Sequence, residues 1–96
     1  MRAFARVDAN QKLIVSALRK SGCMVLSLAP LGKGAPDLLI GRQGMIWLAE
    51  VKDGKKPPSH RSLTPDQIKW KAKHPQVEVH LITSAAEALR LIGIVT

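Results

Sequence analysis

The chain of 96 residues is short of aromatic side chains and of cysteine: it has one cysteine, no tyrosine, one phenylalanine and two tryptophans. A single cysteine excludes a disulfide framework and a cysteine-rich zinc site. So few rings argue against the stacking platforms that single-strand-binding proteins use, and contact with a duplex backbone fits better. Cys23 lies in an apolar run, so we expect it to be buried packing.

Long hydrophobic runs are also absent. No apolar stretch approaches the length that crosses a membrane, and residues 1–9 lack the apolar region of a signal peptide. We therefore expect a cytoplasmic protein with no membrane partner. We also expect that it uses no small-molecule cofactor.

Acidic residues are scarce: seven Asp and Glu face fifteen Lys and Arg, for a formal net charge of +8. A polyanionic partner, most often DNA, accounts for this excess, although a basic but unspecialised surface would have the same composition. The length predicts one domain over residues 1–96, with a small core that a second subunit could complement.

Capping signals and apolar spacing predict the order α-β-β-β-α-β-α. A first helix starts at a capping box of Asp8 and Gln11 and ends at Gly22; a second starts at Thr64, with Gln67 at N3. We predict strands at residues 23–29, 37–40, 45–51 and 77–83, a basic flexible loop at 53–62, and helices at about 64–73 and 84–92.

Two carboxylates interrupt the hairpin formed by residues 37–51. If a turn of two or four residues is centred on Gln43 and Ile40 opposes Met45, Asp37 and Glu50 become diagonal neighbours on one face, with Cβ atoms roughly 7 Å apart. Lys52 shares that face, since side chains alternate along a strand. A three-residue turn would instead separate the two acids.

Paired carboxylates without clustered Cys or His favour a hard cation, so we expect Mg²⁺ or Mn²⁺ between Asp37 and Glu50. Lys52 could then orient or deprotonate an attacking water, or neutralise a transition state. Alternatively, Asp37 caps a turn while Glu50 and Lys52 face solvent. The spacing together with the positive charge favours the site.

The ordered motifs GKGAPDLLIG, EVKDG and LTPDQ, following a capped first helix, resemble the VRR-NUC (virus-type replication-repair nuclease) family of PD-(D/E)XK nucleases. Within this family the chain more closely resembles the small stand-alone members found in phages and prophages. The resemblance implies a restriction-endonuclease-like αβββαβ core, an α/β fold with a mixed central sheet flanked by helices. It also implies Mg²⁺- or Mn²⁺-dependent cleavage of structured DNA, by homodimers that act on four-way junctions.

The same resemblance assigns roles to individual residues. Asp37 and Glu50 match the metal-binding acids, Val51 would offer its carbonyl to the ion, and Lys52 matches the catalytic lysine. Gln67 matches a recurrent glutamine, although capping also explains it. A glutamate of the first helix is replaced here, with Asn10, Gln11 and Asp8 as the nearest candidates for a metal ligand.

Several basic residues are candidates for DNA contacts. They are Lys33 beside the motif, Lys55, Lys56, His60 and Arg61 in the loop, and Lys69 and Lys73 on the second helix. Trp47 is expected in the core or a subunit interface, and Trp70 in the core rather than against DNA. The resulting hypothesis is a homodimeric endodeoxyribonuclease. The alternative is a DNA-binding or nuclease-accessory module whose metal site has decayed.

Overall fold

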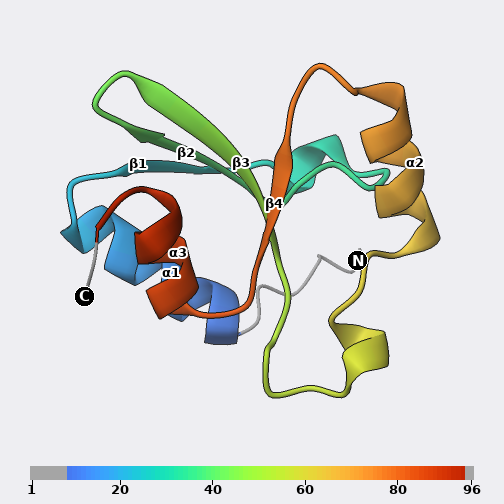
Figure 1. Cartoon of the computed structure of the whole chain (residues 1–96), viewed down its shortest axis with the longest axis horizontal. Coiled ribbons are helices and arrows are strands. Elements are labelled where there is room, and N and C mark those ends of the chain that lie inside the picture. The colour runs from blue at the N-terminus through green and yellow to red at the C-terminus, as the bar shows by residue number, and fades with distance from the viewer. Residues whose placement is uncertain (1–8, 95–96) are drawn as a thin grey trace, which may run out of the picture.

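The computed structural model describes residues 9–94, which form an α/β fold with helices flanking a four-stranded sheet (Figure 1). The order predicted from sequence is confirmed. The helices are α1 (Ala9–Lys20), α2 (Pro65–Lys73) and α3 (Ala85–Leu91), and the strands are β1 (Met24–Ser27), β2 (Leu38–Arg42), β3 (Met45–Val51) and β4 (Val79–Ile82). Two short 3-10 helices, η1 (Ala29–Leu31) and η2 (Pro58–His60), lie in loops.

The helix ends follow the local signals in the sequence. Gly22 adopts a φ of 89°, and Cys23 N donates to Leu18 O at 3.1 Å, which is the bond that closes a Schellman motif after α1. Thr64 and Gln67 form the predicted capping box of α2. Ser84 Oγ accepts from Glu87 N at 3.1 Å at the start of α3. The predicted N-cap of α1, Asp8, lies outside the described residues.

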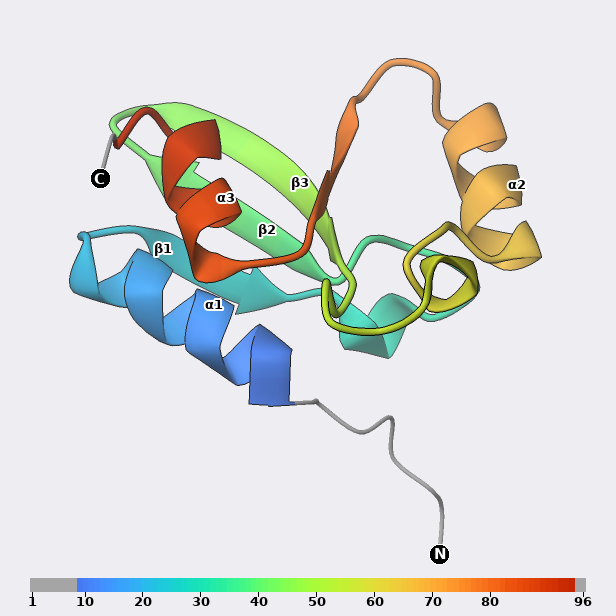
Figure 2. The ribbon, with the colours of Figure 1, turned by 60° about the horizontal axis from the view of Figure 1, so that its bottom comes forward.

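The sheet has the order β1-β2-β3-β4, with β3 and β4 parallel and the other pairs antiparallel. Helices α1 and α3 lie side by side on one face of it, and α2 stands apart (Figure 2). The core fills the space between the sheet and α1 and α3. Its buried residues are Ile14, Leu18, Cys23, Val25, Leu38, Ile40, Ala49, Val51, Ile82, Ala88 and Ile92, and Trp47 packs against them.

The hairpin register predicted from sequence is wrong by two residues. Arg42, rather than Ile40, opposes the first residue of β3, Met45. Only Gln43 and Gly44 form the turn, and their φ values of 51° and 81° are those of a two-residue type I′ connection. The parity is unchanged by this correction, so the side chains keep their predicted faces.

The opposite face of the sheet is apolar and open. It carries Met24, Leu26, Ile46 and Leu81, whose side chains are 48%, 51%, 66% and 46% exposed. Cross-strand pairing links them through Gly41, Leu39, Leu48 and Val79 in the intervening strands. Among the helices of residues 9–94, none is long and apolar enough to cross a lipid bilayer.

Candidate active site

The β2–β3 register brings the two candidate acids directly opposite each other. Leu38 pairs with Ala49, so one further step places Asp37 against Glu50, where Cβ atoms of facing residues are about 4.5–5.5 Å apart. Asp37 is held through both its side chain and its backbone. Its Oδ2 accepts from Val51 N at 2.8 Å, and its backbone carbonyl accepts from Leu28 N at 2.8 Å. The corrected register therefore brings the acids closer than the diagonal arrangement predicted from sequence.

Glu50 is 3% exposed and is the buried charged residue of the described chain. Its Oε2 accepts from Gln67 Nε2 at 2.7 Å. Burial, followed by the hydrogen bond and negative charge of Asp37, raises the pKa of Glu50 to about 8, while the charge of Lys52 opposes the rise. At neutral pH, without a cation, this carboxyl therefore carries a proton.

Gln67 serves the helix and the site at the same time. Its Oε1 accepts from Thr64 N at 2.8 Å and its backbone N donates to Thr64 Oγ1 at 3.2 Å, which completes the capping box. The remaining donor, Nε2, points to Glu50. The capping interpretation and the site interpretation of Gln67 are thus compatible, because they use different atoms of one amide.

Lys52 follows β3, on the face that Glu50 occupies. Its backbone N donates to Ile82 O at 3.0 Å, and its carbonyl accepts from Asn10 Nδ2 at 2.8 Å. Asn10 Nδ2 also reaches Thr83 O at 3.2 Å, so this residue of α1 ties together the chain leaving β3 and β4. Its predicted role as a metal ligand stays a prediction, with the amide nitrogen engaged in holding Lys52.

The donor set around Asp37 and Glu50 fits a hard divalent cation. Both side chains offer carboxylate oxygens, and a cation between them would oppose the burial and repulsion that raise the pKa of Glu50. No group of three or more His, Cys, Asp or Glu with metal-binding geometry occurs within residues 9–94. Mg²⁺ commonly accepts one or two carboxylates and completes its shell with water and phosphate.

Gly34 leaves no room for a DNA backbone to approach. A Cβ built on Gly34 would lie 2.2 Å from Asp66 O, so the space is filled by the first turn of α2. Gly34 also has a φ of 84°, in the left-handed region that favours glycine. A Cβ at Gly32 would have no atom of residues 9–94 within 4 Å, so a DNA backbone could approach there.

The other candidate DNA contacts lie on three segments of the chain. Lys33 precedes Gly34, and both line a hollow of about 250 Å³ that also contains Asp37 and Gln67. The loop between β3 and α2 carries exposed Lys55, Lys56 and His60 and half-buried Arg61. Lys69 and Lys73 lie one turn apart on α2.

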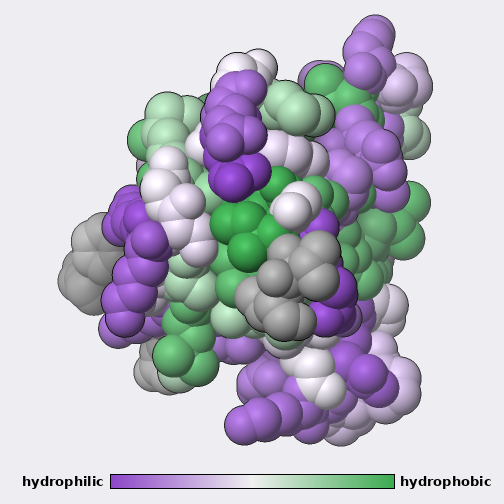
Figure 3. Space-filling model, turned by 60° about the vertical axis from the view of Figure 1, so that its left-hand side comes forward, coloured by the Kyte–Doolittle hydropathy of each residue, from purple (hydrophilic) through white to green (hydrophobic). Residues whose placement is uncertain are grey.

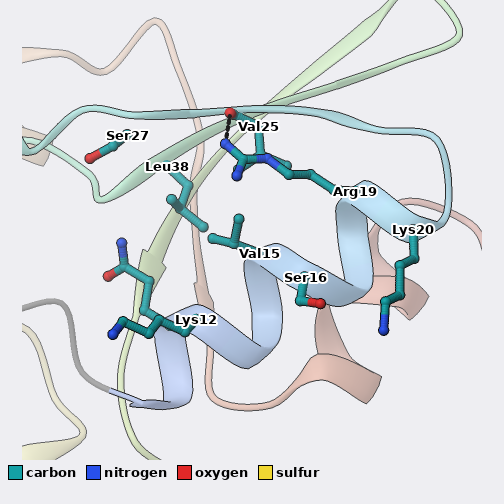
Figure 4. Close-up of a pocket in the computed structure, with 9 residues that line it drawn as sticks. Lys12, Val15, Ser16, Arg19, Lys20, Val25, Ser27 and Leu38 are labelled. Carbon is teal, nitrogen blue, oxygen red and sulfur yellow. Dashed lines mark hydrogen bonds between the residues drawn. The ribbon is translucent and has the colours of Figure 1, made fainter.

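Two features were missed by sequence reasoning. Trp70, expected in the core, contacts none of it; its ring packs on His74 with centroids 4.3 Å apart, and α2 has no buried residue. A groove of about 620 Å³ also lies between α1 and β1, with Lys12, Arg19 and Lys20 at its rim (Figure 4). The i, i+7, i+8 spacing of these three cations places them on one side of α1, and this spacing could have predicted a basic rim from the sequence.

The groove has an apolar floor of Val15, Val25 and Leu38. Arg19 Nη2 donates to Val25 O at 3.0 Å across it. Seen from the left-hand side of Figure 1, where α1 and α3 lie, hydrophobic side chains form a patch bordered by long hydrophilic ones (Figure 3). The groove opens on the helical side of the sheet, whereas Asp37 and Glu50 belong to the other face.

Comparison with solved structures adds an independent observation. The chain is similar to a VRR_NUC domain with 30% sequence identity and a TM-score of 0.59, over 85% of this chain and 88% of that one. The chain belongs to the VRR-NUC family. No family model and no curated protein matches it. Membership confirms the resemblance seen in the sequence motifs and the restriction-endonuclease-like α/β fold, and it identifies this VRR-NUC chain as a nuclease domain.

Proposed function

We propose that this VRR-NUC domain is an endodeoxyribonuclease that uses Mg²⁺ or Mn²⁺ to hydrolyse phosphodiester bonds in branched DNA, acting on four-way junctions as a homodimer. The observation that carries the proposal is the direct opposition of Asp37 and Glu50, with Lys52 two residues further along the same strand face. Membership in a nuclease family supports it.

Asp37, Glu50 and the Val51 carbonyl would hold the cation, which when bound would polarise the phosphate and acidify water. The hydrogen bonds from Val51 N and Gln67 Nε2 fix one oxygen of each carboxylate. In hydrolysis one P–O bond forms from water, the ester P–O bond breaks, and the leaving oxygen gains a proton. Lys52 would orient the water or neutralise charge in this step.

The charge distribution around the acids supports a DNA substrate. The loop that follows β3 begins just after Glu50 and Lys52. Its basic residues could therefore hold phosphates beside the scissile bond; they are Lys55, Lys56, His60 and Arg61. Arg61 Nε is buried and has no hydrogen-bond partner among residues 9–94, which costs roughly 1–3 kcal/mol. A phosphate that drew this guanidinium out of its present position would remove that cost.

The open sheet face supports a homodimer. Away from the end that carries Asp37, Glu50 and Lys52, the rows of side chains on this face are apolar, whereas the chain as a whole carries +8, so two copies could approach here with little repulsion. Contiguous exposed apolar surface of this kind marks protein interfaces. A two-fold arrangement also suits a junction, because resolution requires two matched nicks.

Cleavage of a labelled four-way junction, with Mn²⁺ or with EDTA, tests the activity. Asp37→Asn and Lys52→Ala are expected to abolish nicking and leave junction affinity within about 3-fold, since neither side chain is part of the proposed backbone contacts. Glu78→Gln and Lys71→Ala are matched controls, because their side chains lie away from the acids. Wild-type nicking rates in either site variant would refute the site.

The presence of only two carboxylates in the described part of the site favours one alternative, a DNA-binding module without catalysis. The same assay separates the two. Salt-sensitive junction binding that never yields Mn²⁺-dependent nicks would support the module.

The dimer is tested by sedimentation. Ile46→Lys places a charge in the open face and is expected to give monomers that nick one strand at a time. Leu13→Lys is the control, because Leu13 is 65% exposed on α1 and Ile46 is 66% exposed. A wild-type monomer, or a dimer unaffected by Ile46→Lys, would exclude this interface.

A further inference from the structure

A second hollow adjoins the candidate active site. It has a volume of about 840 Å³ and lies between the β1–β2 loop and α2. Trp70, Leu31 and Ala72 supply apolar wall, and Leu31 is 65% exposed. Since Trp70 is excluded from the core, a large half-buried ring lines a cavity in contact with solvent.

The hollow is predominantly cationic at its edge. Among residues 9–94, its lining includes the cations Lys33, Lys69 and Lys73 and one carboxylate, Asp66. Lys69 and Lys73 occupy the same side of α2, one turn apart. An aromatic wall edged by lysines matches a nucleobase with its flanking phosphates, because bases stack on rings and lysines contact the backbone.

The backbone conformation at Lys33 adds a second observation. Its φ of 53° lies in the left-handed region, where a side chain costs roughly 1–2 kcal/mol compared with glycine. The strained position brings a lysine to the boundary between two cavities, because Lys33, Gly32 and Asp66 line both this hollow and the one that contains Asp37. Strain of this kind is typical of functional positions.

We propose that this hollow binds one unpaired nucleotide of the DNA substrate, with its base against Trp70 and its phosphates on Lys33, Lys69 and Lys73. The proposal rests on the proposed nuclease function and narrows it. Substrates with a single-stranded arm or an unstacked base at the branch are preferred over intact duplex. One ring suffices, because only one base is held.

Binding of a flap substrate and of a matched intact duplex, in EDTA, tests the hollow without relying on cleavage. A 2-aminopurine in the unpaired position reports stacking by its fluorescence. Trp70→Leu is expected to weaken flap binding about 10-fold and duplex binding less than 2-fold, because stacking acts only on the unpaired base. Trp70→Phe should restore most of the flap affinity, and Ile68→Ala is the control on the same helix.

Lys33→Gly provides a variant that relieves strain instead of introducing it. Its stability should be unchanged or higher, while flap affinity falls about 3-fold or more, so unfolding cannot explain the loss. Lys71→Ala, outside the hollow, should have no effect.

The outcomes separate the hollow from the nuclease function. Equal wild-type affinity for flap and duplex, or a Trp70→Leu variant that keeps the flap preference, overturns the hollow even if metal-dependent nicking is present. Trp70-dependent flap binding without any nicking supports the hollow and contradicts the nuclease function.

Discussion

Substitution of Glu50 by glutamine should stabilise the metal-free protein while abolishing cleavage. With a pKa of about 8 when folded and an ordinary value of 4.5, Glu50 takes up a proton on folding at neutral pH. Each pH unit between 4.5 and the working pH costs about 1.4 kcal/mol, so the cost at pH 7 is about 3 kcal/mol. Glutamine avoids this cost, and its carbonyl can still accept from Gln67.

The pH dependence follows from the direction of the pKa shift. Because the folded state holds the proton of Glu50 more tightly, the contribution of Glu50 to wild-type stability is greatest at low pH and falls as pH rises from 4.5 to about 8. The advantage of Glu50→Gln should therefore be near zero at pH 4.5, reach about 3 kcal/mol at pH 7, and level off above pH 8. At pH 7 the melting temperature should rise by roughly 10 °C or more.

Thermal and urea unfolding in EDTA at pH 5, 7 and 8 measures the effect. Glu78→Gln is the control, because the Glu78 side chain is 80% exposed and its removal should change stability little at any pH. Adding Mn²⁺ should stabilise the wild type, since a ligand that binds only the folded state raises its stability, and should stabilise Glu50→Gln much less. A variant no more stable than wild type at pH 7, or an advantage independent of pH, would show that Glu50 is not a buried neutral carboxyl.

Three further substitutions test the surroundings of the site. Gly34→Ala should destabilise the fold by more than about 2 kcal/mol in urea unfolding, because its Cβ would meet the carbonyl of Asp66 at 2.2 Å and its φ is positive; unchanged stability would contradict the contact. Gln67→Glu keeps a capping partner at N3 but replaces the donor to Glu50 with a carboxylate, so helix content should persist by circular dichroism while Mn²⁺-dependent nicking falls at least 10-fold; wild-type nicking would remove Gln67 from the site. Asn10→Ala loses hydrogen bonds to two backbone carbonyls and should lower the free energy of unfolding by about 1–2 kcal/mol. Because Asn10 holds the backbone of Lys52, kcat should fall while KM stays unchanged; a change in KM alone would contradict a positioning role.

Local chemistry allowed much of the fold to be predicted. The start of α2 is determined by atoms within four residues, so Thr64 and Gln67 revealed it from sequence alone. The sequence could predict that Asp37 and Glu50 lie on the same face of the sheet, because this depends only on whether the turn has an even or an odd number of residues. The exact register was not, since Gln43 adopts a positive φ that is usual for Asn, Asp or Gly, and nothing in its type announces a two-residue turn.

The prediction that Trp70 lies in the core was wrong for a different physical reason. Helical spacing shows which residues share a face of α2, but it does not show whether that face meets the sheet. Here α2 packs against the loop that contains Gly34, and Trp70 and Ala72 line a hollow instead of the core. The tertiary placement of a short helix depends on contacts far away in sequence, which no local pattern records.

The first turn of α2 combines three structural roles: it packs against the β1–β2 loop, it caps the helix, and it holds Glu50. Gly34 admits the Asp66 carbonyl, Thr64 caps the helix, and the same Gln67 amide that completes the cap also holds Glu50. Glu50 is buried on a sheet face that is otherwise open, so its burial depends on this turn being in place. Fraying of the α2 N-terminus should therefore expose Glu50, lower its pKa towards 4.5 and loosen the acid pair, even though no residue of α2 belongs to the hydrophobic core.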